Sequence, residues 1–413
     1  MIPLLWIGLV GGSLAAGSAL AMLLVVARRR EGLVMVAGVA SITLSVLAGN
    51  RLLTVYDRPS LAVIASVIAM AAIGGGFALV SSLLAYLRPK QNLPTLPVVG
   101  APPRALVIVI ADVETEDYAP GEVTSEIADL IDSGLPEPSL SVVPFHYAAQ
   151  KARYRAVGGR SPEQGQAAGL AERVEGRLDR TRFAGPIVLR CEDGSSLDGL
   201  LGAAHEAGFD SAIAAGACIA EGNRAHAERR GADAPVPGLS VSYTRSLWVS
   251  DELARLVARR TLAVRSDPQI TGVALVVHGQ PGAYEHVNQT FDIQENAFAN
   301  RIRLFLVEEG LQSDRIRVCA AEWRDPGVTE TVRHLAALGC DRILVVPACH
   351  PFANLQTLLD IPAAARDARV SENVRVVHIA PWGDDPVFAE VLAAGIEEAA
   401  GSDAPGTGVS ARR

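Results

Sequence analysis

Hydrophobic residues are concentrated at the start of the chain, where two long runs contain no charged side chain. Residues 3–27 and 60–87 have no Asp, Glu, Lys or Arg, and each is longer than the roughly 20 residues that span a hydrocarbon core. Residues 32–49 form a shorter apolar run that is rich in Gly, Ser and Thr. The pattern predicts about three transmembrane helices within residues 1–87. No ionisable residue lies inside these spans to suggest a transport pathway, so we expect a plain anchor.

Basic residues beside the spans predict the orientation of this anchor. Arg28–Arg30 follow the first span, and Arg88 and Lys90 follow the third. Because basic loops remain cytoplasmic, three spans place both clusters inside only when the N-terminus is outside. A cleaved signal peptide is the alternative for the first span, but its apolar run is too long and its basic cluster comes after it. We expect an integral protein of the inner or plasma membrane whose large domain is cytoplasmic.

Beyond the spans, residues 88–103 contain five prolines and no apolar periodicity, which predicts a semi-rigid linker. Short apolar runs then alternate with amphipathic stretches. Continuous apolar strands between helices are typical of a parallel sheet that is covered on both faces. The predicted strands are residues 105–111, 185–191, 211–216, 272–279, 315–323, 342–349 and 374–380.

An internal repeat predicts how these strands are grouped. Residues 207–223 align without gaps on residues 338–354 and share a Gly, an Asp, an Ala-Cys pair and an Asn. We therefore predict an α/β fold with two similar Rossmann-like halves and mainly parallel sheets. The halves cover residues 104–262 and 263–398, and residues 399–413 form a disordered tail.

Ligands of such sheets bind beyond the carboxyl ends of the strands. This rule selects a set of polar side chains: Asp112, Cys191, Glu192, Asp193, Cys218, His278, Trp323, Cys349 and His350. His278 is the strongest candidate, because an imidazole can accept a proton or bind a metal near neutral pH. Taken alone, it could also be a strand-end histidine that bonds only to backbone.

The charge and the cysteine content exclude some classes of function. Nearly all acidic residues lie beyond residue 110 and the net charge is −8, which argues against a nucleic-acid partner. The five cysteines include no Cys-x-x-Cys pair, so we expect a reducing compartment and no disulfide framework.

Four stretches resemble the ferrochelatase family, the single-subunit (class II) tetrapyrrole chelatases. They are GLPEPSLS with RYRAVGGRSPEQGQAAGLAERVEGRL (134–141, 153–178), VVHGQP (276–281), VCAAEWRDP (318–326) and VVPACHPFANLQTLLDIP (345–362). The resemblance covers about 290 residues in matching order. It implies insertion of ferrous iron into protoporphyrin in heme biosynthesis, with the iron and the porphyrin as substrates. It gives no protein partner.

The resemblance also assigns site residues. His278 falls on the family's invariant histidine, which implies a proton acceptor or metal ligand. Gln356 takes the place of the family's active-site glutamate as the second catalytic and metal-binding position. Trp323, Tyr154 and Cys191 are expected to contact the tetrapyrrole. No cysteine follows Cys349, so no iron–sulfur cluster is expected.

Several departures from the family keep other functions open. A carboxamide at Gln356 cannot bind iron as an anion or transfer a proton as a carboxylate does. Cys191 and Asn354 replace family histidines. The alternative is therefore a non-catalytic descendant that binds a tetrapyrrole or a protein partner. A chelatase for another metal, such as cobalt, is a third possibility.

The predicted orientation can be tested with reporters fused after residue 413. A reporter that needs the cytoplasm should be active, because both basic clusters face that side. A matched fusion after residue 57, in the loop between the second and third spans, should be active only as a periplasmic reporter. A C-terminal fusion active only in the periplasm would contradict the predicted topology.

Overall fold

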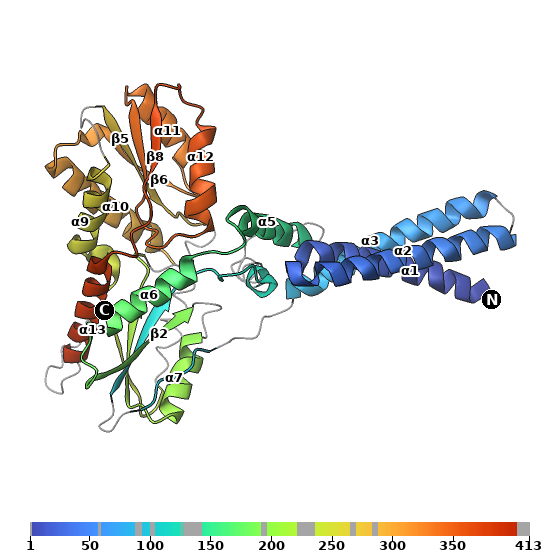
Figure 1. Cartoon of the computed structure of the whole chain (residues 1–413), viewed down its shortest axis with the longest axis horizontal. Coiled ribbons are helices and arrows are strands. Elements are labelled where there is room, and N and C mark those ends of the chain that lie inside the picture. The colour runs from blue at the N-terminus through green and yellow to red at the C-terminus, as the bar shows by residue number, and fades with distance from the viewer. Residues whose placement is uncertain are drawn as a thin grey trace. The chain divides into compact units, whose positions relative to one another are not determined.

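The computed structural model describes residues 2–56, 59–86, 93–99, 104–124, 127, 143–190, 196–220, 236–264, 270–282 and 288–402. The chain forms two compact units (Figure 1). The N-terminal unit contains Met1–Lys90 and Asp117–Arg160. The α/β unit contains Gln91–Glu116 and Ser161–Arg413. The second segment of the N-terminal unit is therefore an insertion into the chain of the α/β unit.

Three long apolar helices form most of the N-terminal unit: α1 (Ile2–Val25), α2 (Arg28–Tyr56) and α3 (Pro59–Tyr86). Each is long and apolar enough to cross a membrane, as the hydrophobic pattern predicts. Helices α1 and α3 approach so closely that a Cβ atom at Gly17 or Gly76 would collide with a backbone carbonyl of the other helix. Small residues allow this close packing where no hydrophobic effect drives association. Ser13 and Ser45 add a hydrogen bond of 2.6 Å between α1 and α2.

The insertion packs against one end of these helices through α5 (Val143–Ala156) (Figure 1). Val143 and Tyr147 are fully buried in a cluster with Val25 of α1 and Leu84 of α3. The hydroxyl of Tyr118 donates to the carbonyl oxygen of Val25 at 2.7 Å. Since the last carbonyls of a helix have no partner within it, this contact satisfies one of them. The insertion is thus a structural part of the N-terminal unit.

The α/β unit contains two four-stranded parallel sheets of the same design. The first has the order β2-β1-β3-β4 and the second β6-β5-β7-β8. Their strands are β1 (Ala105–Ala111), β2 (Phe183–Arg190), β3 (Ser211–Gly216), β4 (Ser240–Tyr243), β5 (Thr271–Val277), β6 (Ile316–Ala320), β7 (Arg342–Pro347) and β8 (Arg375–His378). The repeated segments supply β3 and β7, which occupy equivalent places. Two similar halves with parallel sheets, as predicted, are confirmed.

Helices cover both faces of the sheets (Figure 1). They are α6 (Glu163–Glu175), α7 (Ser196–Glu206), α9 (Asp251–Leu262), α10 (Phe291–Glu308), α11 (Val328–Ala337), α12 (Ile361–Asp367) and α13 (Pro386–Ser402), with short 3₁₀ turns at Leu247–Val249 and Ser313–Arg315. The C-terminal helix α13 crosses to the first half and packs against α6, α9 and β3. Two exposed ion pairs, Arg177–Glu390 and Arg182–Glu397, border this contact. The last helix therefore completes the core of the first half.

Part of the predicted linker also packs on the α/β unit. Leu96 and Val99 lie against the buried cluster that contains Leu106 and Leu200. The chain leaves this unit after Glu116 and returns at Ser161, whose backbone N–H donates to the Glu116 carbonyl at 2.8 Å. Because these two points are adjacent, the insertion could be removed without stretching the α/β unit.

We predict that a fragment of residues 91–413 aggregates, because loss of α1 and α3 exposes the apolar side chains of Val143 and Tyr147. The same fragment with residues 117–160 replaced by a short Gly-Ser linker should be soluble and folded. Size-exclusion chromatography and circular dichroism would compare the two. A monomeric, folded 91–413 fragment would show that the insertion does not need the helices.

Candidate functional site

The carboxyl ends of β5 and β7 bring two histidines into contact. The strands pair in parallel with Val276 opposite Pro347, so the residues that follow each strand meet at the same edge of the sheet. The rings of His278 and His350 lie with their centroids 3.6 Å apart and their planes tilted by 33°. Two of the residues selected as strand-end residues therefore lie in contact.

A buried carboxylate fixes the orientation of His278. Glu295, in the second turn of α10, has no exposed surface. Its Oε1 lies 2.6 Å from Nδ1 of His278 and accepts from the His278 backbone N–H at 3.1 Å. Its Oε2 accepts from the backbone N–H of Gly279 at 3.0 Å. With the proton on Nδ1, Nε2 presents a lone pair, and no described residue engages that nitrogen.

Gly279 allows this arrangement because its φ is +77° and a Cβ there would collide with the carbonyl oxygen of Glu322. Glu295 is not among the residues that the strand-end rule selects. Its signal is a carboxylate on the buried face of an amphipathic helix, between the buried residues Phe291 and Phe298. A charged residue in an apolar stripe is rarely buried without a partner.

His350 is held differently. It is buried, and its Nε2 lies 2.6 Å from Oε1 of Gln356. Because an amide oxygen only accepts, Nε2 carries the proton, and Nδ1 has no hydrogen-bond partner among the described residues. Burial lowers the pKa of His350 well below its usual value, and the neighbouring His278 lowers it further. His350 is therefore neutral at physiological pH.

Gln356 begins a π-helical turn, Gln356–Asp360, that leads into α12. Such turns are rare and occur often at functional sites. His278 and Gln356, the two predicted catalytic positions, are therefore linked through His350 rather than in direct contact.

Side chains of the first half hold the segment that follows β7. Asn354 Nδ2 donates to Glu163 at 3.1 Å, and the backbone N–H groups of Leu355 and Ala353 donate to Glu114 and Gln166 at 2.8 Å each. Burial raises the pKa of the Glu163 carboxyl well above its usual value, and the charge of the nearby Glu114 carboxylate adds to this effect. The site thus lies where the two halves meet.

The other three predicted site residues are Trp323, Tyr154 and Cys191, and no described contact joins any of them to the His278 or His350 ring. Trp323 follows β6 with a φ of 63° and is 63% exposed. Its neighbour Glu322 donates a backbone hydrogen bond to the His278 carbonyl at 3.1 Å. Tyr154 is buried in α5, which belongs to the N-terminal unit. Cys191 lies outside the described residues.

The thiol nearest the site is not a ready metal ligand. Cys349 Sγ donates to the backbone carbonyl of Glu295 at 3.8 Å, and burial raises the thiol pKa well above its usual value. A neutral thiol binds metals poorly, since the thiolate is the ligand. Within the described ranges, no group of three or more His, Cys, Asp or Glu residues could hold a metal ion.

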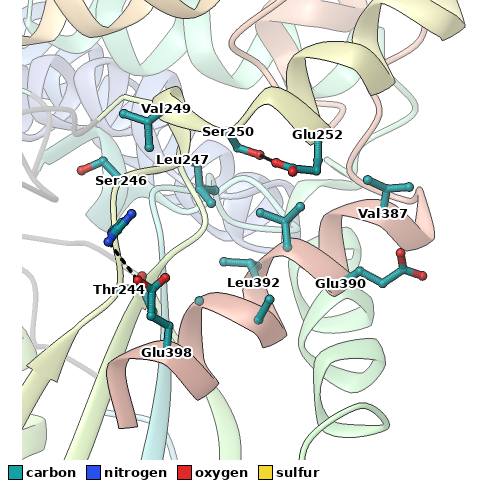
Figure 2. Close-up of a pocket in the computed structure, with 14 residues that line it drawn as sticks. Thr244, Ser246, Leu247, Val249, Ser250, Glu252, Val387, Glu390, Leu392 and Glu398 are labelled. Carbon is teal, nitrogen blue, oxygen red and sulfur yellow. Dashed lines mark hydrogen bonds and ion pairs between the residues drawn. The ribbon is translucent and has the colours of Figure 1, made fainter. Parts of the chain in front are cut away.

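A separate hollow of about 570 Å³ lies beside α13 in the α/β unit. Figure 2 shows Glu390, Leu392 and Glu398 of α13 across it from Leu247 and Val249. None of the predicted site residues lines it. It is therefore distinct from the strand-end site.

The chain was compared with known proteins. No curated protein matches it. The solved structures that are similar to it include the following three, all at low identity. SirB from Bacillus subtilis with Fe³⁺ has a TM-score of 0.45 and 11% identity, covering 73% of this chain and 97% of that one. The sirohydrochlorin chelatase SirB from Bacillus subtilis subspecies spizizenii in complex with cobalt has a TM-score of 0.40 and 13% identity, covering 58% and 90%. DR2241 from Deinococcus radiodurans, a multi-domain protein with structural similarity to chelatases, has a TM-score of 0.41 and 14% identity, covering 71% and 54%.

The family comparison is more specific. Residues 294–399 match the family model CbiX. This range begins one residue before Glu295 and includes His350 and Gln356. The match supports the expectation of a tetrapyrrole chelatase without naming ferrochelatase. The match lies within the second α/β half and does not extend to the first half.

Proposed function

We propose that this chain is a membrane-anchored chelatase that inserts a divalent metal ion into a tetrapyrrole. The observation that carries the proposal is the strand-end His278, which the buried Glu295 orients beside a second, neutral imidazole. The match of residues 294–399 to a chelatase family supports it.

Metal insertion requires a group that accepts protons, because two pyrrole N–H protons leave as the metal enters. Nε2 of His278 is available for this role, since Nδ1 is committed to Glu295 at 2.6 Å. The Glu295 carboxylate would stabilise the imidazolium that forms. Nδ1 of the buried, neutral His350 carries a second lone pair, with no hydrogen-bond partner among the described residues. A carboxylate partner of this kind also fixes the tautomer and the ring orientation of a metal-binding imidazole.

Protoporphyrin and ferrous iron are the substrates that we propose first. The four ferrochelatase-like stretches support this choice. Three helices long enough to cross a bilayer also support it, since an apolar porphyrin partitions into membranes. The CbiX match makes sirohydrochlorin, with iron or cobalt, the second pair to test.

A non-catalytic tetrapyrrole-binding protein is the other candidate. Gln356 stands where ferrochelatases have a glutamate, and its amide oxygen accepts a hydrogen bond from Nε2 of His350. A carboxylate there could bind the metal as an anion or take up a proton, whereas an amide can do neither. This substitution favours binding without turnover.

His278→Ala should lower metal insertion by about 10²–10⁴-fold, the usual effect of losing a positioned proton acceptor. Porphyrin binding should persist. The assay is anaerobic incubation of the detergent-solubilised full chain with protoporphyrin and Fe²⁺, or sirohydrochlorin and Co²⁺, followed by visible spectra. His334→Ala, an exposed histidine on α11, is the matched control. Wild-type protein that neither inserts metal nor changes a tetrapyrrole spectrum would refute both functions.

Gln356→Glu separates the enzyme from the binding protein. In a chelatase limited by the missing carboxylate, this change should raise the rate of insertion about tenfold or more, because an anionic oxygen replaces the amide beside His350. In a binding protein, the substitution should reveal no turnover in the same assay. Gln356→Leu tests whether any gain comes from charge and not from loss of the amide.

A further inference from the structure

The N-terminal unit contains a cavity of about 470 Å³ at one end of its long helices. Ala27, which connects α1 to α2, lies in its wall beside Lys151 and Arg155 of α5. Tyr118, Tyr154, Asp117 and Gly159 complete the lining. The cavity therefore combines basic and aromatic side chains at the end of a predicted transmembrane helix.

Two cations in the wall of this cavity have more N–H donors than they have contacts with described residues. Lys151 is buried, and its ammonium contacts the Leu23 carbonyl at 3.1 Å and the Glu31 carboxylate. Arg155 contacts the same carboxylate at 2.5 Å through one guanidinium nitrogen. An ammonium has three N–H donors and a guanidinium five. Both cations share Glu31, so their charge is only partly neutralised.

The surrounding charges favour an anion. Asp117, the acidic residue in the lining, is paired with Arg160 at 3.4 Å. The acidic residue of the lining thus has a cationic partner of its own, separate from Lys151 and Arg155. Helix α2 begins at Arg28, directly after Ala27, and the free N–H groups of a helix N-terminus attract anions.

The aromatic side chains of this cavity are of the type that is common at a membrane–water interface. The rings of Tyr118 and Tyr154 meet edge to face, with centroids 6.0 Å apart. Burial raises the pKa of Tyr118, so its hydroxyl stays neutral and donates to the Val25 carbonyl. Tyrosines gather at the level of lipid headgroups because their rings are apolar and their hydroxyls polar.

We infer that this cavity binds the phosphate group of an anionic phospholipid, with Lys151 and Arg155 as its main contacts. The inference uses the membrane placement of α1–α3 and is independent of the chelatase function. Basic pockets between membrane helices on the cytoplasmic side are suited to such headgroups. The lipid would bridge the α1–α2 connection and α5.

Native mass spectrometry of the full chain in a non-ionic detergent can test this. Titration with phosphatidylglycerol should give tighter binding than titration with phosphatidylcholine. Arg155→Gln should weaken phosphatidylglycerol binding about fivefold, since each basic residue near an anionic surface contributes a factor of that order. The side chain of Arg155 is 55% exposed, so the variant should fold. Arg51→Gln, at the other end of α2, is the control and should bind as the wild type does.

Competition identifies the source of the phosphate group. Glycerol phosphate and inorganic phosphate should displace the lipid only at much higher concentrations, because they lack the acyl chains that anchor a lipid beside the helices. Equal competition by inorganic phosphate would overturn the lipid assignment in favour of a free anion. Equal binding of the two lipids, or an unchanged Arg155→Gln variant, would overturn the site itself.

Discussion

The buried carboxylate of Glu295 organises the candidate site. It accepts hydrogen bonds from two backbone N–H groups and from the His278 ring, and it has no contact with water. A buried charge is tolerated only when such partners compensate for the lost hydration. The turn after β5, the tautomer of His278 and the rotation of α10 against the sheet are therefore coupled. Loss of this one carboxylate would leave three donors without their partner.

The two units have different physical requirements, although one chain passes through both. The α/β unit buries its sheets under helices, as soluble proteins do. The N-terminal unit instead exposes most of the apolar surface of α2 and α3, including Leu33, Val36, Val63 and Met70. Such a surface is stable only in lipid or against another protein. The insertion connects the two units along the chain. It follows Glu116 of the α/β unit, and it packs against the ends of α1 and α3.

The sequence was sufficient for the sheets, since continuous apolar runs and the repeat at 207–223 and 338–354 encode strand position locally. It also selected His278 and His350 as strand-end residues, although their contact depends on β5 and β7 being neighbours in one sheet. Glu295 was missed because its contact depends on how α10 is rotated against β5. The packing of α5 was missed for a related reason. An amphipathic helix shows which of its faces is buried, and not which surface covers that face.

Helix α13 has a consequence for how the protein is made. The first α/β half is synthesised before the second half. Its core nevertheless includes Phe388, Leu392 and Ile396 of α13. Domains generally fold as units during synthesis, N-terminal parts first. Here, buried residues on α9, such as Leu253 and Val257, lack their final cover until α13 has been synthesised. The nascent first half would thus remain incompletely packed until the second half has also emerged.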